Sequence, residues 1–413
     1  MRRRLVNVHI DASLTATEVD VAGTRVSVAF THDVLGVGAD VRVREAASAA
    51  VRTLGPVVDA EASIVKQLEA KLADTLAVRR VRLVAACPRM ETLSSSVQLH
   101  PRLAQRLGLP APEGDVLSAL PRGATLAVDG VHLLEGDLAP LPRLLDACAS
   151  AGAQLAVVDA LGFGVLGPQG GGVVEHLGLR GHVDFQVLGL RSLGAVGWAI
   201  AGRADWVDAV AAHDDGVLSA PSVAAALAGL EIAQAEPHRR ARLFELTEQL
   251  LLALRAMGLD TGPAVTPWIP VLVGDEALTE QWARAAAETG VVVHALLDGT
   301  ASRVLLALPA TTSDAQLAAV VNGIERTCRR VPLPAVRPAT SVLVSRPGTY
   351  IISAPCSPAW GVPQHAPDHR PLSARPIFDV FETLTWKAAN ARRPSWPGMA
   401  SLRALVDRTR RGK

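Results

Sequence analysis

Side chains that could act as amine nucleophiles are scarce in this sequence. Its 413 residues include only four lysines, Lys66, Lys71, Lys387 and Lys413. A lysine amine is the side chain that forms a Schiff base with a carbonyl compound, and an arginine guanidinium stays protonated and cannot replace it. The long segment from residue 72 to 386 therefore has no amine side chain of its own for Schiff-base chemistry.

A few other residues have types that could do chemistry. His132 and Glu135 could form an acid–base pair, but a structural role is the favoured interpretation. Asp129 and Asp137 flank a tight turn and are predicted to cap turns or helices. The run Gly170–Gly172 is like a phosphate-binding loop, but no Lys-Ser or Lys-Thr follows it, so a flexible turn is predicted. No Ser-His-Asp arrangement and no metal-ligand spacing is evident.

The composition indicates a large α/β core. Apolar residues make up 49% of the chain and aromatic residues only 3%, so Ala, Val and Leu must fill the interior. This suits buried parallel strands covered by Ala/Leu-rich helices. The net charge of +1 argues against a nucleic-acid-binding body. The cysteines, Cys87, Cys148, Cys328 and Cys356, lack CxxC spacing, and no apolar run suits a signal peptide or membrane span, so a cytoplasmic setting is expected.

The elements that must position these residues alternate between strands and helices. Residues 4–31 are predicted to form a β-hairpin, followed by helices at 41–54 and 61–75 and a strand at 81–86. Further strands are predicted at 124–130, 153–160, 183–190 and 197–202, with a helix at 140–152. Strands that alternate with helices predict a parallel sheet with right-handed crossovers.

The second half of the chain has a different pattern. One or two long helices are predicted over 220–257. A smaller α+β unit follows, with strands at 268–274, 291–297 and 303–308 and helices at 276–289 and 313–328. We predict four parts: an N-terminal arm (1–40), a large α/β domain (41–260), a small α+β domain (261–331) and a Pro/Arg-rich extension (332–413).

The end of the extension is strongly basic. From Lys387 to Lys413 it has eight basic residues against one acid, Asp407. A solvated tail is the simpler interpretation, and a docking segment for an acidic partner is the alternative. Two short helices broken by Pro394 and Pro397 are predicted here.

Three motifs in order carry a resemblance to a known family. They are GDLAPL (136–141), GFGVLG (162–167) and LGAVG (193–197), within a segment that resembles the α-oxoamine synthases from residue 129 to 202. The resemblance extends upstream over 31–55 and 68–74 and downstream to about residue 330. It implies an aminotransferase-like large domain of fold type I with a mainly parallel sheet, a pyridoxal-phosphate cofactor, an acyltransferase reaction and a dimer.

The resemblance also assigns residues to the family's cofactor positions, and most of them are apolar. Arg191 stands where the family has its Schiff-base lysine. Val158 stands at the acid that pairs with the pyridinium nitrogen, and Leu161 at a histidine. Leu133 stands where the family has a serine near the cofactor ring. Leu188 and Leu190 stand where the family has two hydroxyl residues near the phosphate.

Three polar residues remain candidates for cofactor contact at these old positions. Asp159 is one residue from the acid position and would need a one-residue bulge to face the ring. His100 is the candidate for the ring-stacking histidine, with a plain surface histidine as the alternative. Arg191 could bind an anion or a partner's carboxylate, or else pair with a local acid or point to solvent. The family's carboxylate-binding arginine falls on Leu305, two residues after Arg303.

The sequence thus predicts a pseudoenzyme with an α-oxoamine synthase fold. It would bind no cofactor and act as a non-catalytic partner in a homodimer, or in a heterodimer with an active paralogue. The alternative is a pyridoxal-phosphate-dependent acyltransferase, joining an amino acid to an acyl thioester, or an aminotransferase-like enzyme with an altered site. Pyridoxal phosphate would be the cofactor of that alternative.

Overall fold

A computed structural model describes most of the chain before the C-terminal extension. The described residues are 4–5, 12–13, 17–21, 24–88, 97–107, 116–117, 120–214, 216–299 and 301–333. The chain divides into two units, Met1–Ser357 and Pro358–Lys413, and all described residues lie in the first. Our predictions for the tail, including Cys356 and the basic docking segment, lie outside the described residues.

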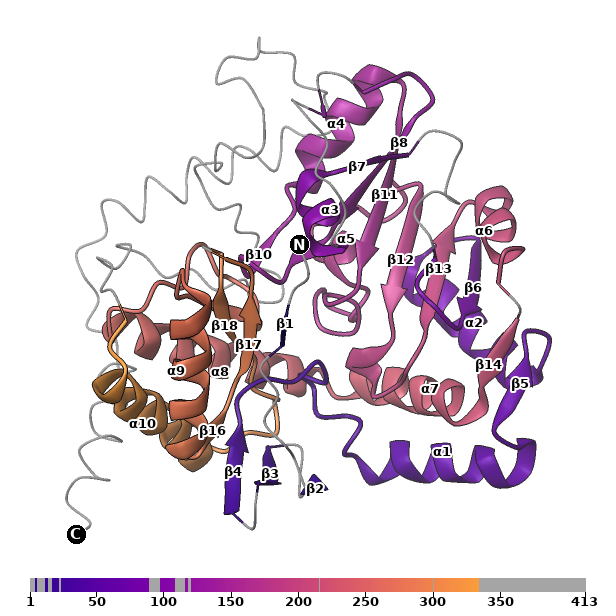
Figure 1. The fold of residues 1–413 in the computed structure, drawn as a ribbon. Helices are drawn as coiled ribbons and strands as arrows, with labels where there is room; N and C mark the ends of the chain where they lie inside the picture. The colour runs from indigo at the N-terminus through magenta and orange to yellow at the C-terminus, as the bar shows by residue number, and fades with distance from the viewer. Residues whose placement is uncertain are drawn as a thin grey trace, which may run out of the picture. The chain divides into compact units, whose positions relative to one another are not determined.

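The large domain is built on a six-stranded sheet (Figure 1). Its order is β6 (Arg80–Val84), β13 (Trp198–Gly202), β12 (Phe185–Gly189), β11 (Gln154–Asp159), β8 (Thr125–Asp129) and β7 (Val97–Leu99). Neighbouring strands from β12 to β7 are parallel, whereas β13 is antiparallel to both of its neighbours. Because only a short turn joins β12 to β13, the chain must reverse there. The predicted α/β fold with a mainly parallel sheet is confirmed.

Helices cover this sheet with small apolar side chains. Leu103 of α3 (Pro101–Leu107) and Val207 of α6 (Ala204–Ala211) share one buried cluster with Val158 and Phe185 of the sheet. Side chains alternate between the two faces of a strand, so α3 and α6 lie on the face of Val158. The helices α2 (Ser63–Leu76) and α4 (Leu141–Ala151) pack against β6 and β11. The short α5 (Val173–His176) follows the glycine run.

The small α+β region has its own four-stranded antiparallel sheet, in the order β1 (Arg4–Leu5), β17 (His294–Leu297), β18 (Arg303–Leu306) and β15 (Ile269–Leu272). Two helices, α9 (Glu276–Glu288) and α10 (Asp314–Arg330), accompany it (Figure 1). Ser313 and Gln316 form a capping box at the start of α10. These elements agree with the predicted ones within a few residues.

The N-terminal arm is more than the predicted hairpin. The strands β3 (Glu18–Val21) and β4 (Thr24–Val28) do form a hairpin, with β2 (Ala12–Ser13) beside it. However, β4 also pairs with β16 (Val291–Val292), Phe30 bridges to Ala307, and β1 joins the small sheet. The arm is therefore tied to the small α+β region by backbone pairing.

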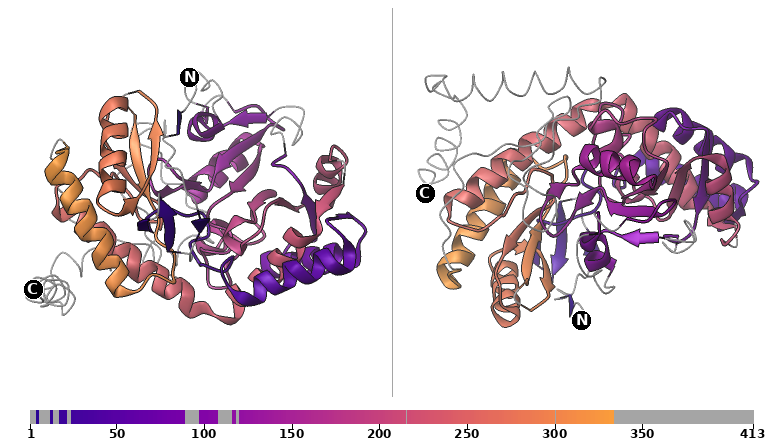
Figure 2. Two further views of the ribbon diagram at one scale, coloured as in Figure 1. Left: turned by 60° about the horizontal axis from the view of Figure 1, so that its bottom comes forward. Right: turned by 90° about the horizontal axis from the view of Figure 1, so that it is seen from above.

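Helix α1 (Val41–Leu54) lies along α7 (Ala220–Ala235) (Figures 1 and 2). It begins at Asp40, whose side chain accepts the N–H of Arg42, and ends at Gly55. The next helix, α8 (Pro237–Ala256), follows α7 directly, so the predicted segment 220–257 is two helices. The remaining elements are the pair β5 (Val57–Asp59) and β14 (Val217–Ser219), the pair β9 (Val131–His132) and β10 (Asp137–Leu138), and the 3-10 turn η2 (Arg191–Leu193).

Candidate functional site

The carboxyl ends of the parallel strands β7, β8, β11 and β12 meet at one edge of the large sheet. Ligands of open α/β sheets bind at this edge. His100 follows β7, His132 follows β8, Asp159 ends β11, and Arg191 follows β12. The fold therefore brings the polar candidates to the edge where a site is expected, and their contacts decide what each can do.

Arg191 opens the turn η2 and is exposed. Within the described part of the chain, no acid pairs with its guanidinium. The turn packs closely on the N-terminal arm, because a Cβ added to Gly194 would lie 2.7 Å from the Cα of Gly38. Gly194 also has a positive φ of 72°, which favours glycine. Of the alternatives for Arg191, its exposure agrees with a side chain that points to solvent, and no acid of the described residues pairs with it.

Asp159 holds a turn. Pairing of β11 with β12 runs without interruption from Ala156 to Asp159, so the one-residue bulge is absent. The Asp159 carboxylate accepts the backbone N–H groups of Gly162 and Val173, each at 2.7 Å. Burial raises the pKa of Asp159 to about 6, against these two hydrogen bonds, which lower it. Its side chain fixes the path from β11 to α5.

The apolar residues at the assigned cofactor positions belong to the packed interior. Val158 and Leu188 are 0% exposed, Leu190 is 3% exposed and Leu161 is 8% exposed. Leu133 is half-buried. Val158 lies in the cluster beneath α3 and α6, so it stabilises the sheet by packing.

His100 lies inside the protein, at only 3% exposure. The alternative of a plain surface histidine is therefore wrong. Its backbone N–H donates to the carbonyl of Ala127 at 2.9 Å, which anchors the start of α3 to β8. Burial, together with the nearby His132 and the charge of Arg102, lowers the pKa of His100 to about 4. The imidazole is neutral at pH 7.

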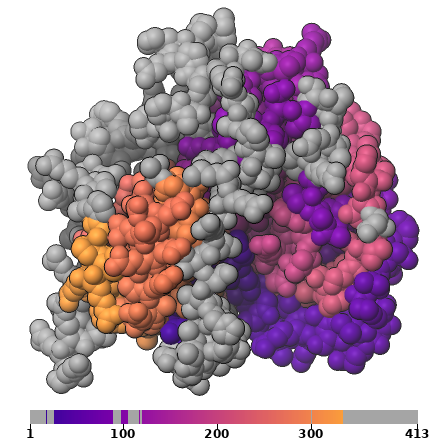
Figure 3. Space-filling model, in the orientation of Figure 1, coloured from indigo at the N-terminus to yellow at the C-terminus, as the bar shows by residue number. Residues whose placement is uncertain are grey.

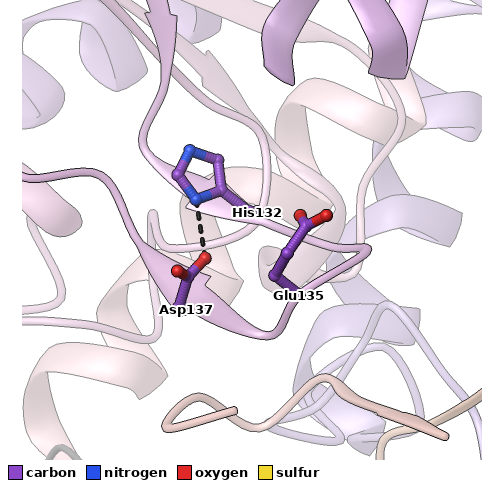
Figure 4. Close-up of side chains that lie close together, drawn as sticks. All are labelled: His132, Glu135 and Asp137. Atoms are coloured by element: carbon purple, nitrogen blue, oxygen red, sulfur yellow. Dashed lines mark hydrogen bonds and ion pairs between the residues drawn. The ribbon is translucent and has the colours of Figure 1, made fainter. Parts of the chain in front are cut away.

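His132 and Asp137 form a buried pair (Figure 4), and Arg102 forms an ion pair with the same Asp137 carboxylate. His132 Nδ1 lies 2.7 Å from Asp137 Oδ1, and Arg102 donates to both Asp137 oxygens at 3.0 and 3.1 Å. Burial raises the pKa of Asp137, but the hydrogen bond with His132 and the charge of Arg102 outweigh it and leave the pKa below its ordinary value. The prediction that Asp137 caps a turn or helix is wrong, because its carboxylate forms hydrogen bonds with the side chains of Arg102 and His132.

His132, Glu135 and Asp137 also bring three possible metal-ligand atoms within 4.8 Å of one another (Figure 4). However, the guanidinium of Arg102 lies 2.9 Å from His132 Nδ1 and already neutralises Asp137. A divalent cation here would meet the charge of Arg102 at close range.

Arg303 of β18 reaches the turn between β9 and β10. It donates to the backbone carbonyls of Leu134 and Ala301, and Glu135 lies 3.9 Å away. Its side chain is only 11% exposed. The arginine two residues before the assigned carboxylate position therefore joins the small α+β region to the large domain and is occupied by these contacts.

The glycine run 170–172 surrounds a carboxylate of the chain itself. Glu175 accepts the backbone N–H groups of Gln169 at 3.2 Å and Gly171 at 2.6 Å, and Arg180 pairs with the same carboxylate. A turn is confirmed, but it is a packed one, and a side chain occupies the place of an anion. Sequence reasoning missed both Glu175 and Arg102, since no motif marks either residue.

The sheet order, the single antiparallel strand beside parallel ones and the small α+β region define a fold type I protein. Solved structures agree. A serine palmitoyltransferase of Sphingomonas wittichii has a TM-score of 0.70 at 22% identity, covering 79% of this chain and 93% of that one. An 8-amino-7-oxononanoate synthase of Francisella tularensis has a TM-score of 0.62 at 16% identity, covering 74% and 98%.

The sequence is similar to bacterial proteins named 8-amino-7-oxononanoate synthase. That of Anaeromyxobacter dehalogenans strain 2CP-C is 36% identical over 206 residues, which are 48% of this chain and 52% of the relative. That of Pseudomonas putida strain GB-1 is 36% identical over 215 residues, 49% and 55% of the two chains. The chain thus spans about half the length of the curated relatives it matches. No family model matches it. Sequence and fold together relate the chain to the α-oxoamine synthases.

The described residues do not fit the pyridoxal phosphate of that family. The assigned lysine position offers a guanidinium, and the assigned acid position offers the buried Val158. The neighbouring Asp159 already accepts hydrogen bonds from two backbone N–H groups. Leu188 and Leu190 offer no hydrogen bond to a phosphate. Each polar group left without a partner in a buried site costs about 1–3 kcal/mol, and a charged one costs more.

None of the described helices is long and apolar enough to cross a membrane. The described cysteines, Cys87, Cys148 and Cys328, form no disulfide with one another, as their spacing predicted.

Proposed function

We propose that the chain is a non-catalytic member of the α-oxoamine synthase fold that acts as a dimer partner or regulatory subunit. The observation that carries the proposal is Arg191 at the end of β12, in a segment of more than 300 residues without lysine. A guanidinium that stays protonated cannot attack a carbonyl carbon, so the covalent step of the family has no nucleophile here.

The packing around the assigned cofactor positions supports the proposal. An enzyme that had only exchanged its lysine would keep a polar lining for the ring and the phosphate. Here Val158, Leu188 and Leu190 are buried in the interior, and the nearest acid, Asp159, is used by a turn. Loss of the lining together with the nucleophile favours a fold retained for a role other than this chemistry.

The outer face of α1 supports a role as a partner. Val41, Val51 and Leu54 of α1 are 59%, 45% and 47% exposed, and Val57, just after the helix, is 55% exposed. In the space-filling view the indigo surface of α1 lies open at the lower right (Figure 3). Val51 and Leu54 are three residues apart and therefore share one exposed side of the helix, and exposed apolar side chains that lie together favour an interface. Its occupant would be a second copy of this chain or a lysine-containing paralogue.

The second candidate function is a pyridoxal-phosphate-dependent acyltransferase with an altered site. The names of the sequence relatives, 8-amino-7-oxononanoate synthases, favour it, and taken alone they favour it over the non-catalytic role. Such an enzyme would have to bind the cofactor without a Schiff base to a lysine of the segment from 72 to 386. The arrangement of Arg191, Val158 and Asp159 argues against it.

An absorbance titration with pyridoxal phosphate separates the two functions. The wild type, Arg191→Lys and a control, Arg52→Lys, would be titrated with the cofactor, and each product would be reduced with borohydride and mapped by mass spectrometry. Arg52 is exposed on α1, so its variant reports non-specific Schiff bases. We expect no site-specific Schiff-base band in any of the three proteins.

The other outcomes are equally informative. A cofactor adduct mapped to one lysine of the wild type would overturn the non-catalytic role and favour the acyltransferase. A band in Arg191→Lys but not in Arg52→Lys would mean that the assigned position still faces an open site. The packing argument would then fail, while the argument from the missing nucleophile would stand.

A further inference from the structure

Three segments that are far apart in the sequence bring basic side chains together beside the turn η2. Arg191 comes from the large domain, His32 from the N-terminal arm and His294 from β17 of the small α+β region. Phe30 joins the two histidines. Its ring stacks on His294 with centroids 4.6 Å apart, and it meets His32 edge-on at 5.2 Å. We call Arg191, His32 and His294 the basic cluster.

Backbone contacts hold the basic cluster in place. The arm segment 29–31 is fixed to the small region, because Ala29 N–H donates to Val292 O, Ala307 N–H to Ala29 O and Thr31 N–H to Ala307 O. On the other side, Gly194 in the turn after Arg191 packs directly against Gly38 of the arm. Backbone hydrogen bonds and close packing therefore fix the segments that carry the three side chains, independently of contacts between those side chains.

No acid neutralises the basic cluster within the described residues. The nearest carboxylate in the sequence, Asp33, accepts the backbone N–H groups of Val37 at 3.0 Å and Gly38 at 2.7 Å. The charge that acts on Asp33 is that of Arg239. Arg191 forms no ion pair with a described acid, whereas Arg239 and Arg42 both do.

His32 provides a second, independent observation. Its Nδ1 is buried and has no hydrogen-bond partner. Buried polar atoms are nearly always paired, so one without a partner calls for a ligand or a water molecule. Burial, followed by the charges of Arg191 and His294, lowers the pKa of His32 to about 4. The turn that carries Arg191 packs on the arm that carries His32, so an anion held by Arg191 could also accept a hydrogen bond from the imidazole.

We infer that the basic cluster is a binding site for a small anionic ligand, with a carboxylate or phosphate group held by Arg191 and hydrogen-bonded by His32. A guanidinium binds both kinds of oxyanion through two parallel N–H groups. Because the cluster spans the arm, the large domain and the small region, the ligand would contact all three. The inference does not depend on whether the chain is catalytic.

Inorganic phosphate and succinate are the probes for this site. Each would be titrated at constant ionic strength into the whole protein, with binding followed by calorimetry and the His32 resonance by NMR. We expect at least one of the two to bind and to raise the pKa of His32, since a nearby anion stabilises the imidazolium. Binding of phosphate alone would indicate a phosphate ester as the ligand, and binding of succinate alone a carboxylate.

Two variants decide whether the binding occurs at the cluster. We expect Arg191→Gln to weaken it at least about tenfold, the effect of losing a charge-assisted hydrogen bond. The control Arg52→Gln, an exposed arginine of α1, should bind like the wild type. His32→Gln should weaken binding less and should remove the assigned NMR signal.

Two results would overturn the inference: neither anion binds the wild type, or Arg191→Gln binds as well as Arg52→Gln. A cofactor adduct in the wild type would overturn the proposed non-catalytic function and leave this result unaffected. The failures of the two proposals are therefore distinguishable.

Discussion

The guanidinium of Arg102 lies 3.0 Å from the carboxylate of Asp137, and their side chains are only 11% and 9% exposed. The pair lies at the carboxyl edge of the sheet, beside His100 and His132. Removing one member of a buried ion pair leaves the other charged and unpaired. The carboxyl edge of the sheet therefore carries a buried ion pair in which each charge depends on the other.

We expect Arg102→Ala to lower the free energy of unfolding by about 3–5 kcal/mol, because Asp137 would remain buried without its cation. The matched control is Arg203→Ala, which breaks the exposed pair with Asp205 and should lower the free energy of unfolding far less. Urea denaturation of both variants measures the difference. Equal losses would show that the buried network adds little.

Metal ions should not stabilise the wild type. The Arg102 guanidinium lies within hydrogen-bond distance of His132 Nδ1 and of both Asp137 oxygens, so a cation beside them would meet a positive charge. We therefore expect the melting temperature to be the same with EDTA, Zn²⁺ or Mg²⁺. A melting temperature that rises with Zn²⁺ in the wild type but not in Asp137→Asn would instead show that His132, Glu135 and Asp137 bind a metal.

The protein should lose stability as the pH falls from about 6.5 to about 4. Burial lowers the pKa of His176 from 6.5 to about 4, so the unfolded chain binds a proton more readily than the folded one. This contribution is complete above pH 6.5 and is about 2 kcal/mol smaller at pH 5. The effect adds to that of the other buried histidines, such as His100.

Comparing urea denaturation at pH 7 and pH 5 tests this. His176→Gln should lose about 2 kcal/mol less than the wild type between the two pH values. The exposed His213 supplies the control, His213→Gln, which should behave like the wild type. The assignment fails if His176→Gln and His213→Gln respond alike.

Leu188 should act as a core residue. It is 0% exposed, so Leu188→Ala should cost about 2–5 kcal/mol by leaving a cavity. Leu272→Ala, at a leucine that is 41% exposed, should cost much less. A small cost at both positions would indicate that Leu188 lines an open cleft, as in an enzyme that binds its cofactor there.

The exposed face of α1 should carry the proposed interface. Leu54→Glu places a charge among Val51, Val57 and the partner's apolar surface, and it should shift a dimer to a monomer in sedimentation velocity. Leu272→Glu, the same change on β15, should sediment like the wild type. A Leu54→Glu protein that still sediments as the wild type does would move the interface elsewhere.

Periodicity predicted the strands and helices well. The apolar runs at 124–130, 153–160 and 183–190 each lie at a strand of the sheet, because a strand buried on both faces must be apolar throughout. Pairing was harder to predict. The arm 1–40 carried a hairpin pattern, yet nothing local indicates that β1 would pair with β17 or Phe30 with Ala307.

The direction of individual polar side chains was the least predictable feature. Asp159 could have faced a cofactor after a single bulge, and only the uninterrupted register with β12 and the N–H groups of Gly162 and Val173 exclude this. The sequence favoured a surface position for His100, which is buried in the structure. Such outcomes depend on neighbours that come from distant parts of the chain.

The sequence by itself determined that residues 72–386 contain no lysine, because this follows from the order of the residues alone. It also determined the layered architecture, because apolar periodicity and turn residues are local properties. Only the tertiary structure decided that Arg102 neutralises Asp137, that Glu175 fills the glycine turn, and that the segments of Arg191, His32 and His294 lie together. The last of these arrangements joins segments that are far apart in the sequence, which packing selects and no local pattern encodes.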